Sequence, residues 1–352
     1  MEFLSEFGLF IAKTVTLVIA VLVIITAIVN AARRQGDSED ESDLRVTRLN
    51  ERYRKTREAM ERGMMSSEDR KSWLKESKKK LKAEAKAKKK EKSSESSEKE
   101  RAKVFVLDFD GDIKASETDT LRKAITAVIA VARPEKDEVM IRLESGGGLV
   151  HSYGLAAAQL DRIRSRNISL TVCVDKVAAS GGYMMACVGD RILASPFAIL
   201  GSIGVVAQLP NVHKLLKKND IDFEVLTAGE HKRTLTVFGE NTEKGRIKFL
   251  EDLEDTHQLF KAYVKERREA VDIESVATGD IWFGQQALEV NLIDEISTSD
   301  DYLLKACERA EVVHVNVRQK QSLPEKLGLA ASTALERSFF KIASVFRDGR
   351  FQ

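Results

Sequence analysis

The chain has 352 residues, of which 43% are hydrophobic and only four are proline, so it is long enough for one large domain or two small ones. The formal net charge of +2 conceals an asymmetry, because residues 33–103 contain 24 Lys and Arg against 16 Asp and Glu. Three cysteines at unrelated spacings, without a CxxC or HExxH motif, argue against a disulfide framework and a metal site. We expect them to be small core residues.

Residues 9–32 are expected to form a membrane span. The stretch is apolar for about the 20 residues that a bilayer core requires, and its one charge, Lys13, lies near one end. A cleavable signal peptide would be shorter and preceded by positive charge, whereas Glu2 and Glu6 precede this stretch. We therefore expect residues 1–35 to be a retained anchor that crosses the lipid bilayer once.

Residues 36–102 are expected to form a basic stalk. Lys, Glu and Ala dominate the segment and core-forming residues are few, which favours helix and solvated linker over a domain. The basic surplus is suited to anionic lipid headgroups. Nucleic acid is not an expected partner, because no aromatic side chains are interleaved with the lysine run for base stacking.

Short apolar strands alternate with amphipathic helices from Val104 onward. The pattern predicts strands over 104–109, 138–143 and 168–174, and helices over 117–132 and 149–164. Such alternation is typical of parallel strands joined by crossover helices, so the domain is predicted to be of the α/β class. The glycine-rich turns at 146–148 and 181–182 then follow strands, at the edge where ligands bind in open α/β sheets.

Ser180 lies at the tip of a small-residue elbow, between a predicted strand and Gly181-Gly182. In one interpretation the serine is only a helix N-cap; in the other it is a nucleophile. Phosphate binding is disfavoured, because the chain contains neither GxGxxG nor GxxxxGK followed by Ser or Thr. Backbone N–H groups at Gly181 and at the triple glycine are suited to hold a developing oxyanion together.

A nucleophilic serine needs a base, and the sequence offers His151, His231 and Lys232. Histidine is the usual base, but no GxSxG motif marks the site. A lysine can serve only if desolvation or a neighbouring cation lowers its pKa from about 10.4, and Arg233 follows Lys232 directly. The residues alone leave the choice of base open.

Three separated stretches, DKVAASGGYMMAC, GSIGVV and GEHKRTLTVFGENTEKGR, resemble in order and spacing the Ser-Lys peptidases of the signal peptide peptidase A family, peptidase family S49. The resemblance implies that Ser180 is the nucleophile and Lys232 the general base. It also implies that Ser202 orients the Lys232 amine by a hydrogen bond, and that the N–H groups of Gly147 and Gly181 hold the oxyanion.

The same resemblance, which extends from the anchor to about residue 316, implies a fold. The expected fold is a crotonase/Clp-protease-like α/β superhelix of repeated ββα units, preceded by the transmembrane helix and the helical basic stalk. The expected domains are an anchor, a stalk, an S49-type peptidase domain and a C-terminal helical tail, at 1–35, 36–102, 103–316 and 317–352 respectively. One departure concerns the first glycine turn, where Gly146 stands in place of the family's usual proline and predicts a looser turn.

The implied activity is cleavage of membrane-derived, signal-peptide-like or unfolded peptides, without ATP and without a cofactor. The implied assembly is a homo-oligomeric dome, for which we expect about eight copies, in a bacterial inner membrane. The positive-inside rule favours a cytoplasmic catalytic domain, whereas the family resemblance favours the opposite face. Two other classes remain open: a non-catalytic membrane scaffold or binding module on this fold, and acyl-CoA chemistry of the crotonase type.

Overall fold

The computed structural model describes residues 44–66, 69–70, 72–73 and 101–317. Leu44–Val317 form one compact unit. The predicted anchor and all of the predicted C-terminal tail after Val317 lie outside the described residues. Within the ranges given above, no helix combines the length and the apolar character needed to cross a membrane.

The strands are β1 (Leu44–Arg48), β2 (Lys103–Gly111), β3 (Glu138–Ser145), β4 (Ser169–Val174), β5 (Val177–Ala179), β6 (Arg191–Ala194), β7 (Ile199–Gly201), β8 (Ile281–Phe283), β9 (Glu295–Ile296) and β10 (Glu311–Val317). The helices are α2 (Leu49–Met64), α4 (Thr118–Val131), α5 (Val150–Arg164), α6 (Gly181–Ala186), α7 (His213–Lys218), α8 (Glu243–Arg267), α9 (Ile273–Val276), α10 (Gly284–Glu289) and α11 (Ser299–Arg309).

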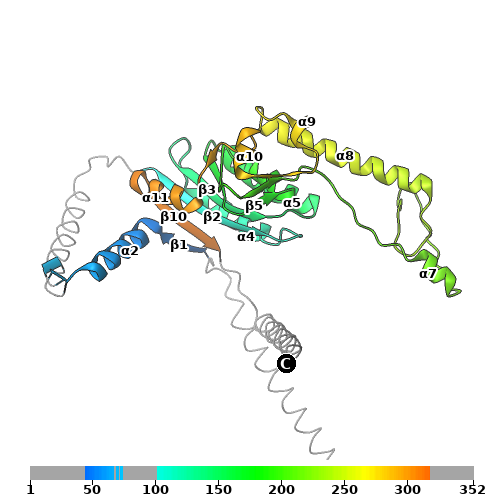
Figure 1. Cartoon of the computed structure of the whole chain (residues 1–352), viewed down its shortest axis with the longest axis horizontal. Helices are drawn as coiled ribbons and strands as arrows, with labels where there is room; N and C mark the ends of the chain where they lie inside the picture. Colours follow the sequence, from blue (N-terminus) through cyan, green and yellow to red (C-terminus); the bar gives the residue numbers. More distant parts are fainter. Residues whose placement is uncertain (1–43, 67–68, 71, 74–100, 318–352) are drawn as a thin grey trace, which may run out of the picture. The chain divides into compact units, whose positions relative to one another are not determined.

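The described strands form one sheet whose main path runs β1-β10-β2-β3-β4-β6-β9 (Figure 1). Neighbours on this path are parallel, except for the antiparallel pair of β1 and β10 at one edge. Parallel neighbours joined through helices confirm the predicted α/β class. The finer prediction, a superhelix of repeated ββα units, stays a prediction.

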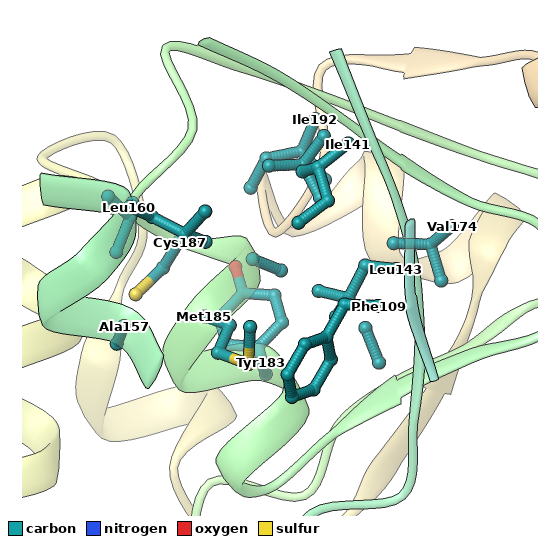
Figure 2. Close-up of a cluster of buried hydrophobic side chains, with 14 of the residues drawn as sticks. Phe109, Ile141, Leu143, Ala157, Leu160, Val174, Tyr183, Met185, Cys187 and Ile192 are labelled. Carbon is teal, nitrogen blue, oxygen red and sulfur yellow. The ribbon is translucent and has the colours of Figure 1, made fainter. Parts of the chain in front are cut away.

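Helices cover both faces of the sheet. Leu107 and Phe109 of β2 belong to the larger core cluster, which includes residues of α4, α5 and α6. Val104 and Val106 point to the opposite face, because side chains alternate along a strand, and they pack with residues of α2 and α11. Figure 2 shows part of the larger cluster, to which Phe109 of β2 and Tyr183 of α6 both contribute. The buried sheet therefore forms a rigid platform between two helical layers.

Residues 44–64 fall within the predicted stalk, yet they lie in the compact unit. β1 pairs with β10, and Leu49 of α2 is buried. The Asn50 side chain donates hydrogen bonds of 3.0 Å to the carbonyl oxygens of Cys307 and Ala310 and accepts one of 2.7 Å from the Val312 N–H. One polar side chain thus ties α2 to the turn between α11 and β10, a long-range contact that local composition does not indicate.

A short branch of the sheet leads to Ser180. β3 pairs with β4 and then, at Ser145, with Ala178 of β5. β5 pairs in turn with β7, which places Ala179 opposite Gly201, and β7 pairs with the antiparallel strand β8. The carboxyl ends of β3, β5 and β7 therefore meet, and the residues that directly follow these three strands become neighbours.

Residues 205–242, which we call the arm, lie between β7 and α8. Within the arm, the Val212 N–H donates to the Val237 carbonyl oxygen at 2.8 Å, and the Asn211 side chain donates to the Thr236 carbonyl oxygen at 2.8 Å. Figure 1 shows α7 beyond the outer end of the long helix α8, away from the sheet. Hydrogen bonds within the arm thus stabilise it, and an ion pair between Glu230 and Lys244 connects it to the N-terminal end of α8.

Candidate active site

Ser180 occupies the turn between β5 and α6 in a strained backbone conformation. Its φ and ψ angles are 53° and −120°, outside the regions that a side chain with a Cβ prefers. Its N–H donates to the Gly201 carbonyl oxygen at 2.8 Å, which fixes the turn to the end of β7. Ser180 makes no N-cap hydrogen bond with its side chain, so the interpretation as a simple helix cap is not supported. Strain of this kind is stored at functional sites.

The triple-glycine turn meets the Ser180 elbow directly. Gly147 has a φ of +87°, and a Cβ added to it would lie 2.7 Å from the Gly181 nitrogen and 2.7 Å from the Ser180 Cβ. Such distances are far below van der Waals contact, so residue 147 must be glycine for both conformational and steric reasons. The two glycine turns are therefore in direct contact, while their joint role in holding an oxyanion stays a prediction.

Two amide groups of the triple-glycine turn, those of Gly147 and Gly148, differ in their hydrogen bonding. The Gly147 N–H donates to the Ser145 Oγ at 3.1 Å. The Gly148 N–H has no hydrogen-bond partner among the described residues, and Gly148 borders the same pocket as Ser180. The assignment of the Gly147 N–H as an oxyanion donor stays a prediction, and Gly148 is a second candidate that the sequence analysis did not identify.

An apolar pocket of about 180 Å³ opens beside Ser180. Its walls come from four places: the glycine turn with α5, the Ser180 elbow with α6, residues 204–205 after β7, and α8. The lining includes Val150, Gly154, Met184, Leu259, Phe260 and Tyr263. Sequence analysis missed the α8 side chains because they follow Ser180 by more than 70 residues and carry no motif of their own.

Ser202 lies next to the Ser180 elbow. It directly follows Gly201, whose carbonyl oxygen accepts the Ser180 N–H, and its own N–H donates to the Asp280 carbonyl oxygen at 2.7 Å. Its φ angle of 49° makes it a second strained non-glycine residue in this corner of the sheet. Parallel pairing of β5 with β7 accounts for the neighbourhood, since each serine follows the last paired residue of its strand.

Lys232 lies on the arm and is exposed. Glu230 pairs with Lys244 at 2.5 Å, and the Thr234 carbonyl oxygen lies 2.2 Å from a Cβ added to Gly245, so residues 230–234 are held at the first turn of α8. Phe260, which borders the Ser180 pocket, follows Glu243 by 17 residues of continuous helix. At 1.5 Å per residue this separation is about 25 Å. The structure therefore does not bring Lys232 to Ser180 of the same chain.

The two histidines proposed as alternative bases differ in position. His151 is exposed on the first turn of α5, next to Val150, which borders the pocket. His231 is exposed on the arm, with its Nε2 3.9 Å from a Glu230 carboxylate oxygen. Among the described residues, no group of three or more His, Cys, Asp or Glu side chains is arranged to hold a metal ion.

All three cysteines are free thiols, and the prediction that they are core residues is confirmed for two of them. Cys173 and Cys187 are buried in the two core clusters, and Cys307 is half-buried. Burial raises the pKa of the Cys187 thiol to about 12, so the nucleophilic thiolate is disfavoured there. Ser180 is thus the candidate nucleophile that the sheet topology places at a pocket.

Comparison with known proteins agrees with this site. The family models "Peptidase family S49 N-terminal" and "Peptidase family S49" match residues 2–160 and 162–313. A protein named "Probable protease SohB" from Haemophilus influenzae is 49% identical over 332 residues, which cover 94% of this chain and 93% of that protein. Its namesake from Buchnera aphidicola subsp. Schlechtendalia chinensis is 48% identical over 306 residues, covering 86% and 99%. Agreement over nearly the whole length shows that the chain belongs to peptidase family S49.

Proposed function

We propose that the protein is a serine endopeptidase that uses Ser180 as its nucleophile and Lys232 as its general base, and that cleaves peptides without ATP. The observation that carries the proposal is the meeting of the strained Ser180 elbow with the triple-glycine turn at the mouth of an apolar pocket. A scaffold would need neither the strained serine nor amide groups that converge beside it.

In the proposed reaction the Ser180 Oγ attacks the carbonyl carbon of the scissile peptide bond while the neutral Lys232 amine accepts the Ser180 proton. The carbonyl oxygen becomes an oxyanion, which the N–H groups of Gly181 and of the triple-glycine turn stabilise. The carbon–nitrogen bond then breaks, and the leaving amine takes the proton back from Lys232. Water attacks the resulting Ser180 ester with the same proton transfers, and the hydroxyl of Ser202 accepts a hydrogen bond that orients the Lys232 amine.

We infer that Lys232 reaches Ser180 across an interface between two copies of the chain. Within one copy the segment that carries Lys232 is held at the first turn of α8, and Phe260 of the Ser180 pocket lies about 25 Å further along that helix. The arm that carries Lys232 also exposes large apolar side chains, among them Val206, Leu215, Ile221, Leu226 and Phe238. Such a surface is typical of a protein–protein contact. A homo-oligomer therefore completes the active site in this proposal, as expected for a ring or dome of identical copies.

The pocket supports a preference for peptides with an apolar side chain next to the cleaved bond. Its volume of about 180 Å³ is suited to a side chain of moderate size, and no charged residue borders it. Apolar segments of this kind occur in membrane-derived and unfolded peptides. We further propose that residues 9–32 anchor the protein in a bacterial inner membrane by a single span, on the basis of their hydropathy.

A direct assay tests this function. Purified protein in detergent is incubated with quenched fluorescent peptides that carry a leucine, an aspartate or a lysine before the cleaved bond, in the absence of ATP. We expect cleavage of the leucine peptide and no cleavage by the Ser180→Ala variant. Equal cleavage by that variant, or no cleavage of any peptide by the oligomeric wild type, would contradict the proposal.

A further inference from the structure

Tyr153 on α5 lies beneath both glycine turns of the candidate site. The side chain is completely buried. A Cβ added to Gly181 would lie 2.4 Å from the Tyr153 Cγ, so the tyrosine ring directly supports the residue that follows Ser180. The other end of the side chain reaches the first glycine turn, because the Tyr153 hydroxyl lies 2.6 Å from the Ser145 Oγ.

In the chain of hydrogen bonds around Tyr153, each hydroxyl has a defined role as donor or acceptor. The Asp112 carbonyl oxygen can only accept, so the Tyr153 hydroxyl donates to it, at 2.6 Å. Having used its one proton, this hydroxyl accepts from the Ser145 hydroxyl, for which the described residues offer one other acceptor, the Gly111 carbonyl oxygen at 3.4 Å. The Ser145 Oγ in turn accepts from the Gly147 N–H at 3.1 Å. Burial raises the pKa of Tyr153, which keeps its donating proton in place.

We propose that Tyr153 is a positioning residue that, through Ser145, sets the spacing between the triple-glycine turn and the Ser180 elbow. Its ring fixes the Gly181 side of the oxyanion site, and its hydroxyl fixes the Gly147 side. This inference rests on the proposed peptidase function, because the spacing matters only if amide groups of the two turns act on one oxygen atom.

The turn needs such a brace because of its composition. Gly146, Gly147 and Gly148 are consecutive, and glycine loses more backbone freedom on ordering than any other residue. Gly146 is exposed, and no atom lies within 4 Å of a Cβ added to it, so packing does not restrain that residue. A buried chain of hydrogen bonds holds the turn instead, and small displacements of catalytic groups are costly, since about 1 Å of misplacement lowers rates by about 100-fold.

Tyr183 provides a matched control. It is also completely buried, and its hydroxyl donates a hydrogen bond of 2.8 Å to a backbone carbonyl, that of Leu292. Removing either hydroxyl deletes a hydrogen bond to a carbonyl oxygen and keeps the ring, and at Tyr153 it also deletes the hydrogen bond from the Ser145 hydroxyl. Only the Tyr153 hydroxyl is connected to the triple-glycine turn. Both Tyr153→Phe and Tyr183→Phe should therefore reduce the thermal midpoint, whereas only Tyr153→Phe should affect catalysis.

The kinetic test compares kcat and KM of the full-length oligomer for the leucine peptide. We expect Tyr153→Phe to lower kcat by about 10- to 100-fold with KM nearly unchanged, and Tyr183→Phe to keep the wild-type kcat. Ser145→Ala should resemble Tyr153→Phe, and the double variant Tyr153→Phe with Ser145→Ala should be no worse than either single variant, because both remove the same chain of bonds. Equal kcat values for the two tyrosine variants would overturn the proposal.

A second readout does not depend on activity. Amide hydrogen exchange is measured for residues 145–149 in the Ser180→Ala background, with and without Tyr153→Phe. We expect exchange at Gly147 to become about tenfold faster when the Tyr153 hydroxyl is absent, since the Ser145 hydroxyl then turns to the Gly111 carbonyl oxygen, and to stay unchanged with Tyr183→Phe. Unchanged exchange with Tyr153→Phe would refute the brace even if the peptidase assay succeeds. Faster exchange in a protein that cleaves no peptide would support the brace and contradict only the peptidase function.

Discussion

Gly147 and Ser180 are in such close contact that a Cβ on residue 147 would lie 2.7 Å from the Ser180 Cβ. The two residues are 33 positions apart in the sequence, and they meet because β3 pairs with β5 at Ser145 and Ala178. The triple-glycine turn directly follows β3, and Gly181 follows the end of β5 by two residues, so parallel pairing alone brings the turns together. This one contact defines the geometry of the proposed oxyanion site.

Gly147→Ala should abolish peptide hydrolysis almost completely. The φ angle of +87° is strained for alanine, and the new Cβ would clash with the Ser180 Cβ, the Gly181 nitrogen and the Ala179 carbonyl oxygen. We expect a loss of kcat of at least about 100-fold, the magnitude of removing one oxyanion donor. Gly146→Ala is the matched control, since no atom lies within 4 Å of its added Cβ and its φ is not in the left-handed region. Equal losses in the two variants would contradict this account of the turn.

Co-expression of Ser180→Ala with Lys232→Ala tests whether the dyad forms between copies. Each variant alone should be inactive. If Ser180 and Lys232 come from different copies, about one quarter of the sites in randomly mixed oligomers combine an intact serine with an intact lysine. We therefore expect about one quarter of the wild-type activity from a mixture of equal parts.

The control for this mixture is Ser180→Ala co-expressed with the double variant Ser180→Ala, Lys232→Ala, which has no intact serine at all. Activity in the first mixture and none in the control would support a dyad between copies. An inactive first mixture, in oligomers shown by affinity tags to contain both variants, would mean that Lys232 acts within its own chain after a movement of the arm.

Gly154 should control which side chain the pocket accepts. It borders the pocket from α5, and no atom lies within 4 Å of a Cβ added to it. Gly154→Ala should stabilise the helix by up to about 1 kcal/mol and retain activity. Gly154→Leu should fill part of the pocket of about 180 Å³ and shift the preference from leucine to alanine before the cleaved bond by at least about tenfold in kcat/KM. An unchanged ratio of the two peptides would show that substrates bind elsewhere.

The pairing of Asp108 with Arg142 and His314 predicts a defined pH dependence of stability. Burial alone would raise the pKa of Asp108, but hydrogen bonds from His314 and Arg142 at 2.6 to 2.9 Å outweigh it and hold this pKa at about 2. An unfolded Asp has a pKa near 3.9. The depressed value means that the stabilisation is complete above about pH 4 and is lost as the pH falls toward 2.

The measurement is the free energy of unfolding of wild type and Asp108→Asn by urea between pH 2 and 6. The difference between them should be modest, since 40% of the Asp108 side chain is exposed, and should shrink steadily below about pH 4. A difference that stays constant down to pH 2 would mean that the Asp108 carboxylate does not contribute through its charge.

Local patterns in the sequence predicted the elements well and their long-range pairing poorly. The strand predicted over 104–109 is β2, Lys103–Gly111, and the helix predicted over 149–164 is α5, Val150–Arg164. Periodicity of apolar residues sufficed for these, because it is a property of neighbours in the chain. It carries no information on which strands pair, so the branch at Ser145 and Ala178 could not be predicted.

The same contrast between local patterns and long-range contacts applies to the candidate site. Ser180 and the glycine turns could be identified from short motifs, since glycine and a strand end are visible locally. Tyr153 and Phe260 could not, because their importance depends on which turn or pocket the fold places beside them. The position of Lys232 likewise depends on α8, because the arm meets the first turn of this helix, about 25 Å from Phe260, and the local sequence pattern does not show how the helix is oriented.

Covalent labelling of Ser180 tests the central claim most directly. The full-length oligomer is treated with a peptidyl phosphonate carrying leucine at the reactive position, digested, and examined by mass spectrometry. We expect one adduct per active chain, located on Ser180, absent in Ser180→Ala, and formed at least about 100-fold more slowly in Lys232→Ala because the serine then lacks its base. Labelling of a different residue, or labelling that is equally fast in Lys232→Ala, would contradict the Ser180–Lys232 mechanism.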